Sequence, residues 1–388
     1  MVRAATVLTI AAGGLSGGAA FAGPATSPVV VTCGEVITTS ITVADNLTCP
    51  GNALSIGADD VTLDLGGHTI RGGGSGVGVQ IVDDNPQISG VTVTNGTIAH
   101  FGSAIQLSNA DGATFSALLL TNDSGVAAPV IDTGRFPISK GLVISDTRVL
   151  HTQGNVIFAQ LNVGAVTVTH SQIAGGAVFF SQSVGPTFTG DSFSNTTVTF
   201  NIEGDTTVTG STFVNSPVVN DGFGFGNDVF QGNTFSAADT ALTLADVANQ
   251  QVTGNTFANN DIGVAISDSP GDTVSGNSFS HNRTAGVYFV DSGPMPHGTL
   301  TVSANKATTN GDSPDGATDP GGLPVEGGIY LYTLHGGASI TNNHTAHDGG
   351  YGIYALPPTP GSPANTSSGN VSVSDFARCY PLNLCTYQ

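Results

Sequence analysis

Tryptophan is absent from this 388-residue chain, and charged residues make up only 9% of it. Lys and Arg together number 8 against 28 Asp and Glu, which gives a formal net charge of −20. A surface of this sign repels nucleic acid and anionic membranes, and it repels free polyuronates unless cations bridge the two. A mainly helical protein would need far more Leu, Glu and Lys. Abundant Gly, Thr, Ser and Asn instead favour strands and turns.

Long apolar stretches are confined to the beginning of the chain. Residues 1–22 start with the basic Met1-Val-Arg3, continue through an apolar, Gly-rich middle and end on Ala20-Phe21-Ala22. This order is typical of a secretory signal peptide that is removed after residue 22; an uncleaved membrane anchor is the alternative. No later segment is long and apolar enough to span a bilayer. We therefore expect a secreted, extracellular protein with no membrane insertion after signal cleavage.

The chain has only four cysteines, and they form two close pairs at opposite ends of the sequence. Four cysteines allow three pairings. In an oxidising exterior we expect the local ones, Cys33–Cys49 and Cys379–Cys385. A metal site is the rival interpretation, but the spacings suit zinc poorly and no His is adjacent.

What the chain has in abundance is a repeat, apolar-x-x-Asn-x-apolar, that returns about every 22 residues. Its clearest copies are Val252-Thr-Gly-Asn255-Thr-Phe257 and Val274-Ser-Gly-Asn277-Ser-Phe279. A fixed period of this length indicates a solenoid, in which each unit buries its apolar face against its neighbours. The central position is Asn, Asp, Ser or Thr in nine of twelve copies, and we expect it to form a stacked ladder at a left-handed turn. The twelve central residues are His68, Gly96, Leu118, Thr147, Ser171, Asp191, Ser211, Asn233, Asn255, Asn277, Asn305 and Asn343.

A second half of each unit contains alternating apolar residues, as in Ile262-Gly-Val264-Ala-Ile266 and Gly328-Ile329-Tyr-Leu331. Alternation is the period of a half-buried strand. The unit therefore holds three short strands, and parallel strands joined in this way wind right-handed. The predicted fold is all-β, a right-handed parallel β-helix of about 12 coils.

This combination of Asn turns and Gly-Ile-x-Ile strands resembles the right-handed parallel β-helix proteins of the pectate-lyase-like superfamily. The opening Leu47-Thr-Cys49-Pro-Gly51 and Val61-Thr-Leu-Asp-Leu-Gly-Gly-His68 resembles the start of many exported members. We expect an N-terminal cap and first coil at 23–60, the β-helix at 61–375, and a C-terminal cap with its local disulfide at 376–388. The resemblance implies the fold; one such scaffold carries lyases, hydrolases, epimerases, tailspikes and adhesins.

The best-known activity signatures of that superfamily are missing here. The polygalacturonase-like branch implies Asn-Thr-Asp and Gly-His-Gly, and the alginate epimerase branch implies Asp-Pro-His-Glu; none of these occurs in the chain. A pectate lyase signature that includes Trp is also impossible. No catalytic residue can therefore be carried over from the superfamily by motif.

Alternation predicts a row of tyrosines on the outer face of three consecutive C-terminal coils. Tyr288, Tyr330 and Tyr354 should point outward, with Tyr332 following, whereas Gln106, Thr199, Thr243 and Ala265 hold the comparable positions of earlier coils. The aromatic row is therefore expected only in the C-terminal third of the chain. Flat aromatic faces suit sugar rings, so we predict these four tyrosines as substrate-binding residues. A structural stack is the alternative.

Ionisable residues gather beside that row, and four of them are the candidate catalytic set: Arg283, Glu326, His347 and Asp348. In a lyase, Arg283 would neutralise a uronate carboxylate; in a hydrolase, two of Asp261, Glu326 and Asp348 would act as acid and base. No metal ligand set is predicted, and no cofactor is certain; calcium is the one possibility.

The insertion from Thr309 to Val325 could form one wall of such a site. Its acidic residues, Asp312, Asp315 and Asp319, could bind calcium, but they lack the spacing of a calcium loop, and a solvated loop is the alternative.

The leading functional interpretation is an exported protein that binds or processes a polysaccharide or cell-surface glycan on its C-terminal coils. The alternative is a non-catalytic scaffold or adhesin. The sequence leaves the glycan, the reaction and the oligomeric state open.

Overall fold

The computed structural model describes residues 27–387 except for 83–86, 123–127, 134–138, 152–153, 161–164, 182–184, 202–203, 225, 270, 292–298 and 335–336. The predicted signal peptide, residues 1–22, lies outside the described residues. In the described part of the chain, no helix has the length and apolar character needed to cross a membrane.

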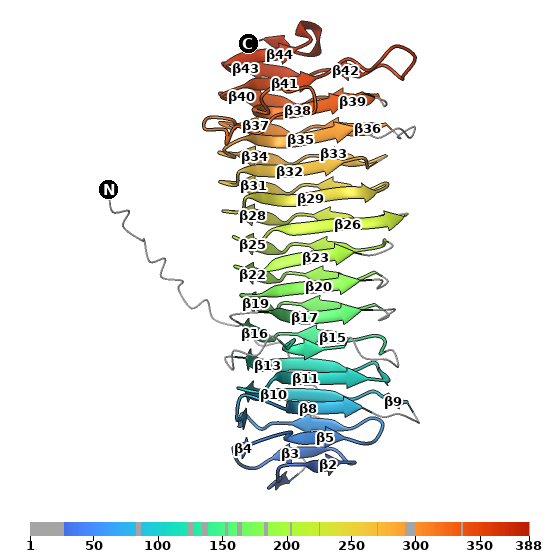
Figure 1. Ribbon diagram of the computed structural model, residues 1–388, viewed down its shortest axis with the longest axis vertical. Coiled ribbons are helices and arrows are strands. Elements are labelled where there is room, and N and C mark those ends of the chain that lie inside the picture. Colours follow the sequence, from blue (N-terminus) through green and yellow to red (C-terminus); the bar gives the residue numbers. More distant parts are fainter. Residues whose placement is uncertain are drawn as a thin grey trace, which may run out of the picture.

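The chain coils into a rod in which every coil adds one strand to each of three faces (Figure 1). All paired strands of the three faces are parallel, as predicted, and each strand lies against its counterpart in the next coil. The third face is one sheet of 15 strands, and the other two faces join into a second sheet because β10 and β13 run through both. The all-β solenoid prediction is confirmed.

The strands of face one are β1 (Pro28–Val29), β3 (Ile41–Val43), β6 (Thr62–Asp64), β10 (Thr92–Ala99), β13 (Thr114–Asn122), β15 (Val143–Ser145), β18 (Thr167–Thr169), β21 (Thr187–Thr189), β24 (Thr207–Thr209), β27 (Val229–Gln231), β30 (Gln251–Thr253), β33 (Thr273–Ser275), β36 (Leu300–Ser303), β39 (Ala338–Thr341) and β42 (Thr366–Ser368).

Face two comprises the second halves of β10 and β13 together with β4 (Leu47–Cys49), β7 (Thr69–Gly72), β16 (Arg148–His151), β19 (Gln172–Ala174), β22 (Ser192–Ser194), β25 (Thr212–Val214), β28 (Thr234–Ser236), β31 (Thr256–Ala258), β34 (Ser278–Ser280), β37 (Lys306–Thr308), β40 (His344–Ala346), β43 (Val371–Val373) and β45 (Thr386–Tyr387).

Face three comprises β2 (Glu35–Ile37), β5 (Leu54–Ile56), β8 (Val77–Val82), β11 (Ser103–Ser108), β14 (Ile131–Asp132), β17 (Asn155–Gln160), β20 (Ala177–Ser181), β23 (Thr197–Asn201), β26 (Val218–Gly224), β29 (Thr240–Val247), β32 (Ile262–Ser267), β35 (Ala285–Asp291), β38 (Gly327–Thr333), β41 (Tyr351–Ala355) and β44 (Ala377–Tyr380). A small side sheet of β9 (Ile88–Ser89) and β12 (Ala110–Asp111) and the 3-10 helix η1 (Leu382–Leu384) complete the described elements.

The core of the rod is filled by one inward side chain per short strand and two or three per long strand. On face two the inward residues of five consecutive coils are phenylalanines, whose rings stack at 4.6 to 5.0 Å between centroids and nearly parallel. This spacing equals the separation of neighbouring strands, so identical residues at one repeat position stack directly. The five are Phe193, Phe213, Phe235, Phe257 and Phe279.

The predicted ladder runs along the turn between faces one and two, and it is almost wholly buried. Asn255 is representative: its Oδ1 accepts hydrogen bonds from the backbone N–H of Asn233 at 2.8 Å and from Asn233 Nδ2 at 3.0 Å. Its own Nδ2 donates to the carbonyl of Phe230 and to Asn277 Oδ1. The same backbone-to-side-chain bond links consecutive central residues from Leu118 to Asn343 and one further copy, Asn370.

The prediction that the central ladder residue itself adopts the left-handed backbone conformation is wrong. The left-handed residue of the turn is not Asn255 but its predecessor, Gly254, at φ +63°. The chain turns at the glycine, and the asparagine contributes the hydrogen bonds of its side-chain amide. Glycine recurs before the ladder residue because left-handed backbone costs it little.

Two further polar columns, which the repeat did not reveal, occupy the other turns. Between faces two and three, the backbone N–H of each column residue donates to the side chain of the next, in the order Ala238, Asn260, Asn282, Asn310, Asp348 and Asp375. After face three, shorter stretches join Thr206 to Asp228 and Gln250 to Asp272. All three corners of the coil are therefore held by the same kind of bond.

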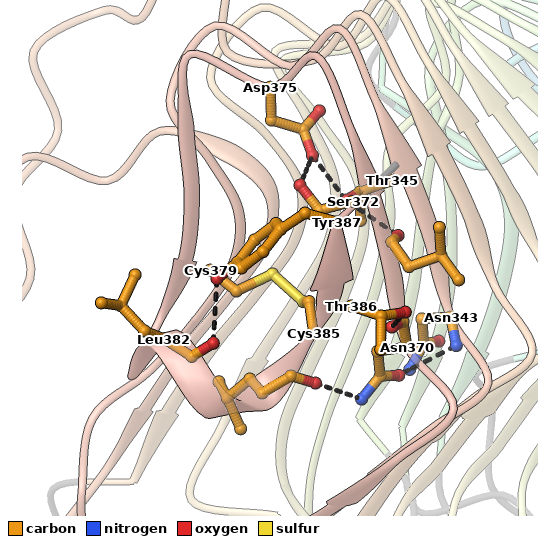
Figure 2. The surroundings of a disulfide bond; sticks show 12 residues. Asn343, Thr345, Asn370, Ser372, Asp375, Cys379, Leu382, Cys385, Thr386 and Tyr387 are labelled. Carbon is orange, nitrogen blue, oxygen red and sulfur yellow. Dashed lines mark hydrogen bonds between the residues drawn. A yellow bond between two sulfur atoms is a disulfide. The ribbon is translucent and has the colours of Figure 1, made fainter.

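Both predicted disulfides are present. Cys33 bonds to Cys49 at the first coils, and Cys379 bonds to Cys385 at the last. The second bond, shown in Figure 2, closes the loop that contains η1, and the Leu384 carbonyl accepts a hydrogen bond from Asn370 Nδ2 at 3.1 Å. The C-terminal cap thus satisfies the last amide of the ladder.

The ladder predicts that Asn255→Ala destabilises the rod. The substitution leaves the N–H of Asn233, the carbonyl of Phe230 and the amide of Asn277 short of partners in a buried turn. Each unsatisfied group costs about 1–3 kcal/mol. We expect the free energy of unfolding, measured by chemical denaturation, to fall by about 3 kcal/mol. Thr253→Ala, on the outward side of β30, should change it little, and an Asn255→Ala protein as stable as the wild type would contradict the ladder.

Candidate functional site: the outer row of face three

One outward position recurs on every coil of face three, and strand register identifies its members. Phe158 pairs with Phe179, which pairs with Thr199, while Ala265 pairs with Tyr288 at the other end of the series. The residues on either side of most members, such as Val178 and Phe180, are buried, so the row lies on the side of the sheet away from the core. We call this the outer row: Val36, Ser55, Gln80, Gln106, Asp132, Phe158, Phe179, Thr199, Val219, Thr243, Ala265, Tyr288, Tyr330, Tyr354 and Tyr380.

The expectation that aromatic residues are confined to the C-terminal third of this row is wrong. Phe158 and Phe179 hold the same outward position in β17 and β20, with ring centroids 5.6 Å apart and planes 12° apart. Both are half-buried rather than buried. The predicted positions Gln106, Thr199, Thr243 and Ala265 belong to the row, but the outward residues of the coils between them had not been assigned. The sequence did contain a signal for them, because alternation in Ile157-Phe-Ala and Val178-Phe-Phe places Phe158 and Phe179 on the outward side.

The C-terminal tyrosines do form a row, and it is longer than predicted. Tyr330 stacks on Tyr354 at 4.4 Å, Tyr354 stacks on Tyr380 at 5.3 Å, and Tyr288 meets Tyr330 edge to face. However, Tyr330 and Tyr354 are only 1% and 3% exposed, and Tyr332 is buried as well. Tyr330 and Tyr354 point away from the central core into a second apolar cluster with Val325 and Ala317. An open sugar-binding row, as predicted, would require these rings to be uncovered.

Residues 312–325 provide the cover. The segment folds back on itself through hydrogen bonds between Asp319 and Leu323 and between Ala317 and Val325. Tyr330 donates its phenolic hydrogen bond to Asp319 Oδ2 at 2.9 Å. Burial and the neighbouring carboxylate raise the pKa of Tyr330 far above its usual range, so this hydroxyl remains a donor at any physiological pH. We call residues 312–325 the covering loop.

Two of the three acidic residues considered for calcium binding make hydrogen bonds that hold the covering loop. Asp319 accepts from Tyr330 and from the N–H of Leu323, and Asp315 accepts from the N–H of Ala317. Among the described residues, no group of three or more His, Cys, Asp or Glu side chains is arranged to hold a metal ion.

The predicted ionisable residues come together at one edge of face three, on successive coils at the turn from face two. Arg283 lies there with its Nε 3.0 Å from Asp261 Oδ1, and Thr284 donates to the same oxygen at 2.6 Å. Although burial acts to raise the pKa of Asp261, the hydrogen bonds from Arg283 and Thr284 hold it below its ordinary value. Asp315 of the covering loop joins this group through its N–H, which donates to Thr284.

The other three candidates lie on the next coils. Glu326 is half-buried just before β38, and His347 is exposed at a left-handed turn position, φ 58°, before β41. Asp348 belongs to the second polar column: its Oδ1 accepts from the N–H and Nδ2 of Asn310, while its Oδ2 is buried without a hydrogen-bond partner. Burial raises the pKa of Asp348 to about 8, despite the bonds from Asn310. A catalytic role for these residues stays a prediction.

The buried carboxyl groups predict a protein that is most stable in acid. Burial raises the pKa of Asp348 to about 8 and that of Asp191 to about 6, each from an ordinary value of 3.8. A raised folded-state pKa contributes stability below pH 4 that is lost as pH rises through 6 and 8. We therefore expect the thermal midpoint to fall between pH 4 and pH 8. The Asp348→Asn side chain cannot ionise, so at pH 8 this variant should be more stable than the wild type by several kcal/mol. Each pKa unit corresponds to about 1.4 kcal/mol.

Asp221→Asn, at an exposed position of β26, is the matched control and should leave the pH profile unchanged. A profile that rises towards pH 8, or an Asp348→Asn protein no more stable than wild type at pH 8, would contradict the assignment of Asp348 to a buried column.

The covering loop predicts a specific effect of Tyr330→Phe. Removing the hydroxyl leaves the buried Asp319 carboxylate without one donor, which costs about 1–3 kcal/mol of loop stability. We expect limited proteolysis to cleave within 312–325 at least several-fold faster than in the wild type. Tyr380→Phe, in the same row but 43% exposed, should cleave at the wild-type rate. Equal rates in all three proteins would show that the hydroxyl does not fasten the loop.

Comparison with known proteins adds evidence on the fold. Residues 196–357 match the family model described as a right handed beta helix region. No curated protein sequence matches the chain.

Among solved structures, the periplasmic alginate epimerase AlgG shares 12% identity over 78% of this chain and 77% of its own, with a TM-score of 0.44. The catalytic unit of a GH87 alpha-1,3-glucanase from Streptomyces thermodiastaticus shares 14% over 89% and 63%, with a TM-score of 0.41. Pectate lyase Pel9A shares 14% over 64% and 70%, with a TM-score of 0.37. At such identities and scores, these similarities carry no conclusion about chemistry. From its parallel three-stranded coils and the matched region, the chain is a right-handed parallel β-helix repeat protein, as the resemblance to the pectate-lyase-like superfamily predicted.

Proposed function

We propose that this is an exported polysaccharide-binding β-helix whose glycan lies lengthwise on the outer row of face three. The observation that supports this proposal is which residues occupy the outer row between β17 and β35. Small uncharged residues, Thr199, Val219, Thr243 and Ala265, separate two aromatic ends, the Phe158–Phe179 pair and Tyr288. Six strand steps of about 4.8 Å make this strip about 29 Å long, enough for several sugar units.

The aromatic ends supply the apolar contacts that sugar binding needs. Phe158 and Phe179 are half-buried and stacked, so they offer neighbouring rings to solvent. Tyr288, at the far end, is also half-buried, and burial together with nearby Asp319 raises its pKa to about 12, so it keeps its hydroxyl proton. Rings held rigidly by a sheet lose little entropy when a ligand stacks on them.

The charges favour a neutral glycan. A chain of net charge −20 repels polyuronates, and the strip between Phe179 and Tyr288 contains no ionisable side chain in its own row. The adjacent outward positions Asn201 and Asp221 are exposed, and such groups form hydrogen bonds with sugar hydroxyls.

The predicted C-terminal site joins this strip at Tyr288. A glycan that continued past Tyr288 would reach the edge where Arg283 and Asp261 form their ion pair, with Glu326 and His347 on the following coils. Tyr330, Tyr332 and Tyr354 would take part only if the covering loop moved away. We therefore place the primary contact on the exposed strip and keep the C-terminal residues as a second contact.

The non-catalytic scaffold remains the alternative, and one observation favours it. Asp348, a candidate acid or base, is bound within a structural column, and Tyr330 is bound to Asp319. A glycan array followed by product analysis of each hit distinguishes the functions. Binding without products supports a binding protein, new reducing ends or unsaturated products support an enzyme, and no binding to any glycan supports the scaffold.

The strip predicts that Phe179→Ala weakens binding of any array hit. Truncating a central aromatic contact typically costs about 1–3 kcal/mol, or about five- to 150-fold in Kd. Val214→Ala, at a 43% exposed position on face two, should leave Kd unchanged in the same titration calorimetry. If both variants bound as tightly as the wild type, the glycan would not lie on this strip.

A further inference from the structure

The C-terminal end of the rod has three strands with free edges. In the described chain, β42 pairs only with β39, β44 only with β41, and β45 only with β43. In Figure 1, β44 is the last described strand of face three. A free strand edge presents unpaired N–H and C=O groups that can pair with another chain.

This end also carries the most exposed large apolar side chains of the described chain. Phe376 is 86% exposed and Leu382 is 72% exposed, and the nearby Tyr380 and Tyr387 are also exposed. The cap holds Leu382 outward: the Cys379–Cys385 disulfide closes the loop that contains it, and Tyr387 donates a hydrogen bond to its carbonyl at 2.9 Å (Figure 2). The exposure is thus built into a tethered segment.

Charge separates this end from the rest of the molecule. Residues 349–388 contain only two charged side chains, Asp375 and Arg378, in a chain of net charge −20. Asp375 is buried and accepts hydrogen bonds from Thr345, Ser372 and the N–H of Asp348. Two copies repel each other wherever their acidic surfaces meet, whereas Arg378 is the one exposed charged residue of 349–387.

We propose that a second copy of this chain docks here, tail to tail, about a two-fold axis. In such a contact β44 of each copy lies against β44 of the other in antiparallel orientation, and Phe376 and Leu382 of both copies become buried. A two-fold contact closes at two copies. This proposal is independent of the glycan-binding proposal.

The alternative partner for the C-terminal end is the N-terminal end of another copy. That end exposes Val29, Val30 and Val36, and continuing the solenoid would place β44 of one copy on β2 of the next. Such a head-to-tail contact does not close and produces filaments of increasing length. The acidic Glu35 in β2 and the neutral cap make the two ends unlike, so the two modes respond to different substitutions.

Sedimentation velocity and small-angle scattering over a concentration series of the disulfide-bonded protein test the proposal. We expect a single dimer of twice the chain mass and nearly twice the maximum dimension. Leu382→Asp and Phe376→Asp should each raise the dimer Kd at least tenfold. Val36→Asp, at the other end, and Leu323→Asp, at a 49% exposed position of the covering loop, should not change it.

A monomer at every concentration would overturn the proposal, as would a dimer that both cap variants leave intact. A continuous series of larger species that Val36→Asp abolishes would replace it with the head-to-tail contact. Circular dichroism and the thermal midpoint confirm that each variant is folded, and the two cap variants provide independent tests if one is not.

Discussion

The hydrogen bond from a backbone N–H to the side chain of the next coil is the interaction on which this structure depends. It recurs at all three corners of the coil, most continuously from Leu118 to Asn370 between faces one and two. Each turn would otherwise bury unpaired backbone groups, which is costly. Because the partner always lies one coil away, the bond also fixes the register of every strand against its neighbour.

This constraint divides each coil into residues committed to structure and residues available for function. Inward positions fill the core and corner positions form the columns, so only outward positions and inserted loops are free to vary. Gly328 illustrates how tightly the corners are packed: a Cβ there would collide with Asp348 Oδ2 and the carbonyl of Gly352. The outer row and the covering loop belong to the free class, as do the ionisable residues Arg283 and Glu326 at the edge.

Periodicity was sufficient to predict the solenoid, the parallel strands and the central residues of one ladder, and the placement of the cysteines at the two ends of the chain was sufficient to predict the local disulfides. Periodicity did not reveal the second column, because Asn260, Asn282 and Asn310 follow the first ladder at a fixed offset and can be mistaken for ordinary turn residues. The sequence therefore did not show that Asp348 is part of this column, and its predicted catalytic role stays a prediction. Alternation correctly predicted that Tyr330 and Tyr354 point away from the central core. It could not predict that the inserted covering loop buries these two rings. Phe158 and Phe179 were missed because their coils lack clear Asn copies.

Native-state hydrogen exchange, resolved for individual amides, tests most directly whether the columns hold the fold together. The amides of Asn233, Asn255 and Asn277 donate to the next ladder residue, and those of Asn260 and Asn282 donate within the second column. The account predicts that these corner amides exchange as slowly as the buried strand amides on either side and open together with them. Corner amides that exchange orders of magnitude faster than the adjacent strands would contradict it, because the strands would then be held in register without the columns.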